Sequence, residues 1–218
     1  MTETFLDCDA VLFDMDGTLV DSRLLVERTW LRWAREHGIP PDKVLAVAHG
    51  RRTLETMRLV APDLATPEEA ARLDAEESEH EGGETAIPGA AALLTSLPPE
   101  RWAVVTSAGR QIALARITGV GLPAPRVLIG AEDVATGKPD PEGYVRAASQ
   151  LGVSPGRTVV IEDTPAGAQA GRGAGAVVVG LRTTYPSVAG CDILVEDLRQ
   201  IRVAPAAAVG RVRLIIDR

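Results

Sequence analysis

Six short runs of apolar, mostly β-branched residues recur along the chain, and they constrain the fold more than any other feature. Within each run the apolar residues are continuous rather than alternating, which indicates strands that are buried on both faces. The sequence therefore predicts a parallel sheet between two layers of helices. The runs are CDAVLFD (8–14), WAVVTS (102–107), RVLIG (126–130), RTVVIE (157–162), AVVVG (176–180) and DILV (192–195).

The segments between these runs carry helix-start and helix-stop signals. Asp140, followed by a proline, predicts the start of a helix through EGYVRAASQL, and Gly152 predicts its end. Thr164 and Gly175 mark the next helix in the same way. Strands that alternate with helices in this order are typical of a doubly wound, Rossmann-like α/β fold.

Residues 21–87 break this rhythm, because no strand is evident there and three helices are predicted. We expect these residues to form an all-helical cap domain inserted into an α/β core of residues 1–20 and 88–218. After the core, VAPAAAVGRVRLIID (203–217) predicts a final extended segment that pairs with Ile201–Val203. The three cap helices are SRLLVERTWLRWAREHG, TLETMRLVAP, and a segment from the capping box at Thr66 to Gly82–Gly83.

Composition limits the classes of protein to consider. A length of 218 residues with 45% hydrophobic residues suits a folded core with one inserted domain. A net charge of −7 without a basic stripe argues against nucleic-acid binding, and no apolar run is long enough to predict a membrane span. An acidic start without a signal peptide, and only two cysteines, predict a cytoplasmic protein. We expect a monomer.

Polar side chains follow the apolar runs, at the carboxyl ends of strands where ligands bind in this architecture. Asp14 and Asp16 are two residues apart, so their side chains can project on the same side. Several carboxylates in one crevice would repel each other unless a cation joined them, and Mg²⁺ prefers carboxylate and phosphate oxygens. The sequence therefore predicts a site for Mg²⁺ and a phosphoryl group. The other candidates are Thr106 and Ser107 for the anion, Lys138, and the pair Glu162 and Asp163.

These motifs resemble the four ordered motifs of the haloacid-dehalogenase-like hydrolase superfamily. They are DMDGT, the strand-terminal Thr106, Lys138 in GKPDPEGY, and EDTPAG, and the resemblance covers nearly the whole chain. HGRRTLET, WAVVTSAGR and EDTPAGAQAGRGAGA are similar to the branch of glycerol-phosphate and 2-deoxyglucose-6-phosphate phosphatases. The resemblance implies a phosphatase for small polyol or sugar phosphates, including glycerol, hexose and hexitol phosphates.

The resemblance also implies a role for each motif residue. Asp14 would be the nucleophile that forms an aspartyl-phosphate. Asp16 would protonate the leaving alkoxide and then deprotonate the attacking water. Asp14, the Asp16 backbone carbonyl and Asp163 would bind Mg²⁺, with Glu162 as a further ligand or a support. Thr106, Ser107 and Lys138 would hold the phosphate.

The cap offers candidates for substrate binding. Arg51 and Arg52 lie near a predicted turn, from which they could reach the phosphate or hydroxyls of a substrate. Glu27 and Glu55 could accept hydrogen bonds from hydroxyls, although acidic side chains on helices usually face solvent.

Two alternatives to a phosphatase remain. A sugar phosphomutase of the β-phosphoglucomutase type would share the site. Mutases of this type carry a histidine in the helix after the first motif, whereas LLVERTW in this chain has no histidine. A non-catalytic sugar-phosphate-binding module would have little need of the intact Asp14, Asp16, Lys138 and Asp163. A dehalogenase would lack the second aspartate of the first motif.

Overall fold

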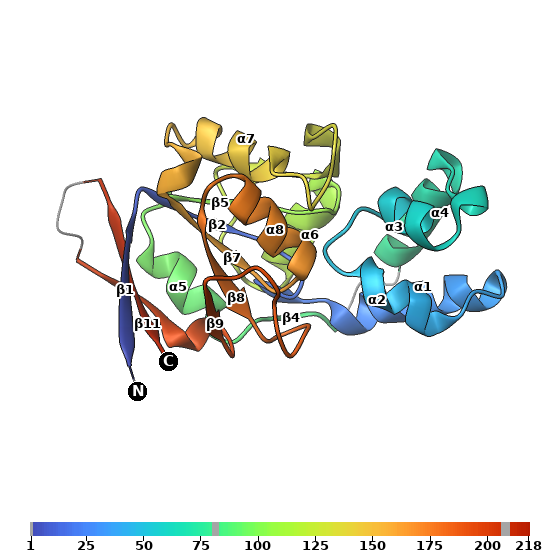
Figure 1. Cartoon of the computed structure of the whole chain (residues 1–218), viewed down its shortest axis with the longest axis horizontal. Helices are drawn as coiled ribbons and strands as arrows, with labels where there is room; N and C mark the ends of the chain where they lie inside the picture. Colours follow the sequence, from blue (N-terminus) through green and yellow to red (C-terminus); the bar gives the residue numbers. More distant parts are fainter. Residues whose placement is uncertain (1, 80–82, 206–209) are drawn as a thin grey trace.

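The computed structural model describes residues 2–79, 83–205 and 210–218. Its centre is a sheet of six parallel strands in the order β6-β5-β2-β7-β8-β9 (Figure 1). Each strand coincides with one of the six predicted runs, which confirms the predicted α/β fold class. The strands are β2 (Ala10–Phe13), β5 (Trp102–Val105), β6 (Leu128–Ile129), β7 (Thr158–Glu162), β8 (Val177–Leu181) and β9 (Ile193–Val195).

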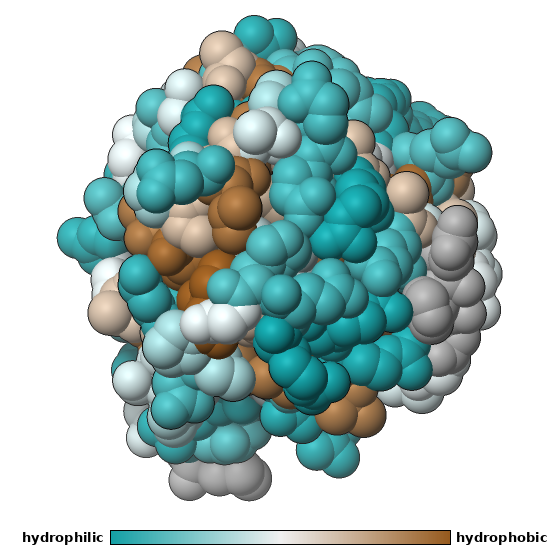
Figure 2. Space-filling model, turned by 90° about the vertical axis from the view of Figure 1, so that its right-hand side faces the viewer, coloured by the Kyte–Doolittle hydropathy of each residue, from teal (hydrophilic) through white to brown (hydrophobic). Residues whose placement is uncertain are grey.

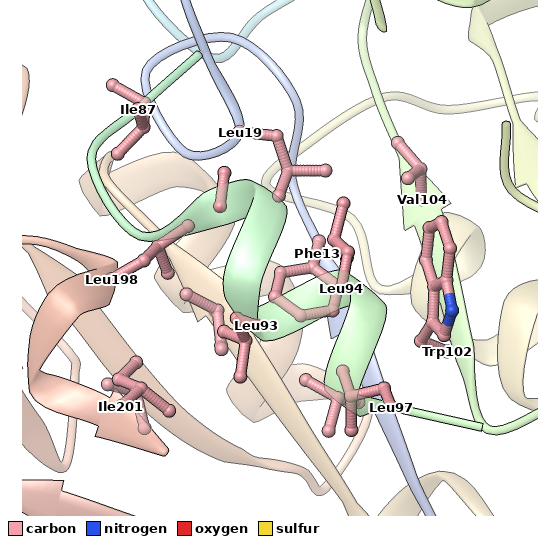
Figure 3. Packing of buried hydrophobic residues seen from close by; sticks show 14 of the residues in the cluster. Phe13, Leu19, Ile87, Leu93, Leu94, Leu97, Trp102, Val104, Leu198 and Ile201 are labelled. Atoms are coloured by element: carbon pink, nitrogen blue, oxygen red, sulfur yellow. The ribbon is translucent and has the colours of Figure 1, made fainter. Parts of the chain in front are cut away.

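Helices cover both faces of this sheet because its strands are apolar on both sides. Phe13 faces one hydrophobic cluster, whereas its neighbour Leu12 faces the other. Figure 3 shows Leu93, Leu94 and Leu97 packed beside Phe13 on the first face. The core helices are α5 (Ala90–Ser96), α6 (Arg110–Gly119), α7 (Glu142–Gln150) and α8 (Pro165–Gly173), with 3₁₀ turns at Ala131–Asp133, Pro155–Arg157 and Leu198–Gln200.

The helices after Asp140 and Thr164 form as predicted, except that the first one begins one residue later. Helix α7 begins at Glu142, and Asp140 Oδ1 accepts a hydrogen bond from the Glu142 backbone N–H at 2.9 Å. Thr164 is the N-cap of α8, and its Oγ1 accepts from the Gly167 backbone N–H at 3.1 Å. These two caps fix where α7 and α8 start.

Four helices, not three, occupy the described part of the predicted insertion. Helix α2 was missed, and the region also contains a 3₁₀ turn at Pro62–Leu64. The predicted end of the third helix at Gly82 lies outside the described residues. The four helices share a hydrophobic cluster around Trp33 and Met57, which supports our proposal that residues 21–87 form a separate cap domain. They are α1 (Arg23–Glu36), α2 (Pro41–Ala48), α3 (Thr53–Val60) and α4 (Pro67–Glu79).

The connections between core and insertion correct a second expectation. β3 (Val20–Asp21) and β4 (Thr85–Ala86) pair as an antiparallel ribbon where no strand was predicted, because two residues are too few to form a pattern. Figure 2 views the molecule from the end formed by helices α1 to α4. Hydrophilic residues cover most of this face around a smaller hydrophobic area.

A second sheet has the order β1-β11-β10 and is antiparallel. The pairing of β10 (Ile201–Ala204) with β11 (Val212–Asp217) confirms the predicted hairpin of the C-terminal segment. β1 (Glu3–Cys8) was not predicted; it lies immediately before the first core strand. Among the described helices, none has the length and apolarity needed to cross a membrane.

Candidate active site

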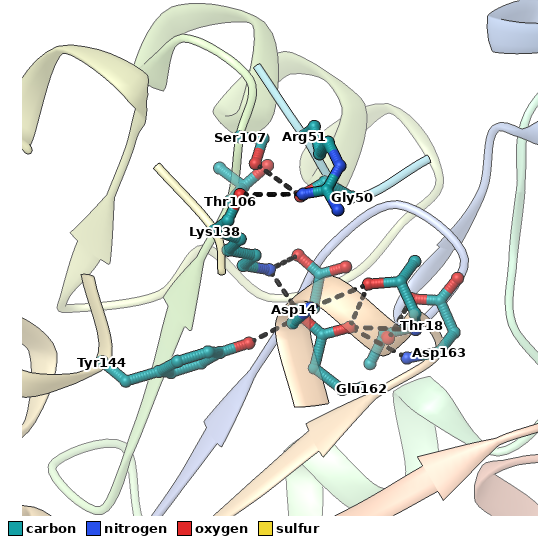
Figure 4. A network of polar contacts seen from close by, with 12 residues as sticks. Asp14, Thr18, Gly50, Arg51, Thr106, Ser107, Lys138, Tyr144, Glu162 and Asp163 are labelled. Atoms are coloured by element: carbon teal, nitrogen blue, oxygen red, sulfur yellow. Dashed lines mark hydrogen bonds and ion pairs between the residues drawn. The ribbon is translucent and has the colours of Figure 1, made fainter. Parts of the chain in front are cut away.

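Two adjacent strands bring three carboxylates together. β2 and β7 pair in parallel, with Phe13 opposite Ile161, so Asp14 and the pair Glu162 and Asp163 leave the sheet side by side. One carboxylate oxygen from each of these three acidic residues lies within 4.8 Å of the other two, and all three residues are buried (Figure 4). The structure thus brings together three of the four acidic residues singled out in the sequence.

Lys138 lies between two of these carboxylates. Its Nζ is 2.5 Å from Asp14 Oδ1 and 2.6 Å from Glu162 Oε1. Tyr144 Oη also donates to Glu162 Oε1, at 2.8 Å. Burial lowers the pKa of Lys138, but the carboxylates of Asp14 and Glu162 together raise that pKa above its ordinary value. The lysine is therefore a fixed cation in the site.

One lysine does not balance the negative charge of the cluster. Burial and the charge of Glu162 raise the pKa of Asp14 well above its ordinary value. The same two causes raise the pKa of Asp163 to about 7, although Thr18 Oγ1 donates to Asp163 Oδ1 at 3.1 Å. A further cation would favour the ionised form of both aspartates, and their oxygen ligands suit a hard divalent ion.

The turn after β2 depends on a glycine. Gly17 has a φ of +82°, and a Cβ at this position would come 2.1 Å from Asp163 Oδ2. Only glycine lets the DMDGT loop approach Asp163 so closely. The loop thereby brings Asp16 to the edge of the acidic cluster, on the wall of a cavity of about 500 Å³.

The hydroxyl residues after β5 also line this cavity. Thr106 Oγ1 accepts from the Ala108 backbone N–H at 3.1 Å. Ser107 Oγ donates to the Gly50 carbonyl oxygen of the cap at 3.0 Å. Thr106 therefore shapes the turn into α6, and Ser107 ties that turn to the cap.

Two of the cap residues singled out in the sequence, Arg52 and Glu55, contact the core. Arg52 Nη1 donates to the carbonyl oxygens of Ala131 and Val134, each at 3.3 Å, and Arg52 pairs with Glu55. Glu55 Oε1 accepts from the Gly137 backbone N–H at 2.9 Å. Arg52 and Glu55 thus dock the cap on the core loop 131–137.

Arg51 and Glu27, the other two cap candidates, differ in their relation to the cavity. Arg51 lines the cavity, and its Nη1 donates to the Lys138 carbonyl oxygen at 3.4 Å. Glu27 is not among the described residues that line the cavity, and its Oε1 lies 3.8 Å from His49 Nε2. Of the predicted cap residues, Arg51, Arg52 and Glu55 reach the cavity wall.

Sequence reasoning missed several polar partners of these residues. Asp16 Oδ1 accepts from Ser22 Oγ at 2.6 Å and from Arg116 Nη1 at 3.1 Å. Arg116 Nη2 donates to Glu77 Oε1 of the cap at 2.7 Å. Tyr144 was also missed. No sequence signal marked Arg116, because arginine makes up nearly all of the 23 basic residues.

Comparison with known proteins agrees with this description. The sequence model of the haloacid dehalogenase-like hydrolases matches residues 8–175. The chain is 42% identical to hexitol phosphatase A of Escherichia coli, over 90% of this chain and 94% of that protein. It is 36% identical to glycerol-1-phosphate phosphohydrolase 2 of Saccharomyces cerevisiae, over 91% of this chain and 86% of that protein.

A solved structure of β-phosphoglucomutase from Clostridium difficile superposes with a TM-score of 0.74. It covers 89% of this chain and 93% of the mutase, at 21% identity, so it shows a shared fold alone.

The fold and the site together define a Rossmann-like α/β protein with an acidic pocket at the carboxyl end of its parallel sheet. The chain belongs to the haloacid dehalogenase-like hydrolases. This confirms the family resemblance inferred from the four sequence motifs.

Proposed function

We propose that this protein is a Mg²⁺-dependent phosphatase that hydrolyses phosphate monoesters of small polyols or sugars. One observation carries the proposal: Lys138 is buried against Asp14 and Glu162, with Asp163 beside them, at the carboxyl end of the sheet. The names of the relatives, a hexitol phosphatase and a glycerol-1-phosphate phosphohydrolase, support this substrate class.

Asp14 is the proposed nucleophile. Its carboxylate attacks phosphorus, the bond from phosphorus to the ester oxygen breaks, and Asp16 gives its proton to the departing alkoxide. Asp16 then takes a proton from water, and that water attacks the phosphorus of the aspartyl-phosphate. Inorganic phosphate leaves and Asp14 is regenerated. The position of Asp16 on the cavity wall suits this exchange of protons.

Asp14, Asp163 and the Asp16 backbone carbonyl are the proposed Mg²⁺ ligands. When bound, the ion would offset the charge of the phosphoryl group and of the carboxylates. Glu162 fits better as a support, because Lys138 and Tyr144 donate to its Oε1 while the Asp163 and Thr164 backbone N–H groups donate to its Oε2 at 3.1 Å. Lys138, Thr106 and Ser107 are the proposed phosphate-binding residues.

The cavity suits a small, hydroxyl-rich substrate. Its volume of about 500 Å³ is that of a small-molecule site, and its walls carry many charged side chains. We propose that Arg51 contacts the substrate directly. Arg52 acts chiefly by docking the cap, and Glu27 acts through His49. Lining residues from the cap include Arg58, Asp74 and Glu77.

The finer expectations from the sequence belong to the same proposal. Cys8 and Cys191 are free, which suits a reducing cytoplasm. We propose that the protein acts as a monomer; the proposed chemistry uses residues of a single chain and needs none from a partner subunit.

The test is phosphate release from glycerol 1-phosphate, a hexitol 6-phosphate and 2-deoxyglucose 6-phosphate, with Mg²⁺ and with EDTA. We expect Mg²⁺-dependent release that Asp14→Asn abolishes, and the largest kcat/KM for a polyol phosphate. Interconversion of sugar phosphate isomers without phosphate release would instead favour the mutase. Binding without turnover would favour the non-catalytic module.

A further inference from the structure

Asp16 is held from one side only. Ser22 Oγ and Arg116 Nη1 both donate to its Oδ1. Within the part of the chain that the structure describes, no donor bonds to Oδ2. Asp16 therefore has one anchored oxygen and one oxygen left for proton exchange, and the anchors decide where the second oxygen points.

Arg116 is the more unusual of the two anchors. It lies on core helix α6, its side chain is only 2% exposed, and it lines the cavity. Its two terminal nitrogens contact different parts of the molecule, because Nη1 donates to Asp16 of the core and Nη2 donates to Glu77 on cap helix α4. A planar guanidinium fixes the angle between these two bonds, which an ammonium could not do.

Glu77 makes this anchor depend on the cap. The Glu77 side chain is about four-fifths buried, and Arg116 Nη2 donates to its Oε1 at 2.7 Å. If the cap moved away, Arg116 would lose its bond to Glu77, which is one of the contacts that set the orientation of its guanidinium. The orientation of Asp16 would then be less firmly fixed from the α6 side.

We propose that Arg116 is a positioning residue for Asp16, and that its bond to Glu77 makes this positioning depend on the closed cap. This inference rests on the proposed function, since it assigns Asp16 to proton transfer. The general acid would thus be aligned only when the cap covers the substrate, so the ester bond breaks in a closed site.

The effect of Arg116 on the rate should depend on the leaving group of the substrate. An alkoxide leaving from a polyol phosphate needs a proton, whereas p-nitrophenolate leaves readily without one. Misplacing Asp16 should therefore slow the first turnover of glycerol 1-phosphate far more than the first turnover of p-nitrophenyl phosphate. A merely structural role for Arg116 would slow both substrates alike.

The experiment measures first-turnover rates and KM for both substrates in Arg116→Met, Arg116→Lys and Glu77→Ala. We expect Arg116→Met to slow release of glycerol on the order of 30-fold, with p-nitrophenolate release within about 3-fold of wild type. Arg116→Lys should recover part of the loss, and Glu77→Ala should show the same selectivity more weakly. Arg146→Met, an exposed arginine paired with Glu142 on α7, is the matched control and should change neither rate.

The outcomes separate this inference from the proposed function. Asp16→Asn tests the acid role itself: if it slows both substrates equally, the assignment of Asp16 fails and the inference fails with it. If Asp16→Asn is selective but Arg116→Met and Glu77→Ala are not, the role of Arg116 is overturned while the phosphatase stands. A rise in KM for both substrates with unchanged turnover in Arg116→Met would make Arg116 a substrate-binding residue, which also overturns the inference. Glu77→Ala and Arg116→Lys decide the matter if Arg116→Met does not fold.

Discussion

Lys138 and Glu162 form a buried ion pair, with Nζ 2.6 Å from Oε1, and neither side chain has appreciable contact with solvent. A buried pair of this kind stabilises little by itself, but removal of one partner leaves an uncompensated charge. Here Lys138 also contacts Asp14, so one cation offsets the charge of two buried carboxylates.

Lys138→Met should therefore destabilise the protein by about 3–5 kcal/mol and abolish phosphatase activity. Urea unfolding and steady-state assays would measure the two effects. Lys43→Met is the matched control, because Lys43 is the other lysine of the chain and donates to the Val60 carbonyl oxygen at 2.8 Å. We expect it to cost about 1 kcal/mol and to leave activity unchanged. Near-wild-type stability of Lys138→Met would contradict the assigned charge balance.

The raised pKa of Asp163 predicts how stability depends on pH. Because its folded pKa is about 7 against an ordinary 3.8, the folded state keeps a proton that the unfolded chain loses in this window. The contribution of Asp163 to stability is thus fully present below pH 3.8 and is lost as pH rises through 7. In EDTA, Asp163→Asn should gain on the order of 2 kcal/mol relative to wild type between pH 5 and pH 8.

Mg²⁺ should reverse this loss of stability at higher pH, because metal binding requires ionised carboxylates. We expect Mg²⁺ to raise the Tm of the wild type more at pH 8 than at pH 5, and to leave Asp163→Asn nearly unchanged. Asp42→Asn, at an exposed position on α2, should respond as the wild type does. A Tm shift from Mg²⁺ that is equal in wild type and Asp163→Asn would place the metal elsewhere.

Gly167 predicts a steric test of the Glu162 position. A Cβ at Gly167 would lie 1.6 Å from Glu162 Oε1, the oxygen that accepts from Lys138 and Tyr144. Gly167→Ala should therefore cost about 2–4 kcal/mol and much of the activity, since Glu162 must move. Gly119→Ala is the control, because among the described residues no atom beyond its chain neighbours and its own helix backbone lies within 4 Å of a Cβ there. Thermal unfolding should show the control as neutral or slightly stabilised, and equal Tm values for both variants would refute the steric argument.

The sequence predicted the parts of the site that follow from strand order. Asp14, Thr106 and Asp163 each follow an apolar run, and parallel strands place their carboxyl ends at one edge of the sheet. Arg116 had no such mark, because its partner Asp16 is 100 residues away and nothing local distinguishes it from the other arginines. The contacts by which Arg116 joins cap and core could therefore not be predicted from the sequence.

The missed elements have equally physical reasons. Helix α2 spans only eight residues, and its stability comes from packing against α1 and α3 rather than from its own periodicity. The strands β3 and β4 have two residues each, so only their pairing defines them.

Arg52 offers a test of how the cap is held on the core. Because Arg52 donates to the carbonyl oxygens of Ala131 and Val134 and pairs with Glu55, its loss should loosen the docked cap rather than remove one substrate contact. Arg52→Ala should then lower kcat/KM on the order of 10-fold for every phosphate ester in a substrate panel, with the order of preference preserved. Arg72→Ala is the matched control, since Arg72 pairs with Glu69, Glu76 and Glu36 inside the cap, and it should leave kcat/KM within about 2-fold. A changed order of preference in Arg52→Ala would instead mean that its guanidinium contacts the substrate, because docking alone affects all esters alike.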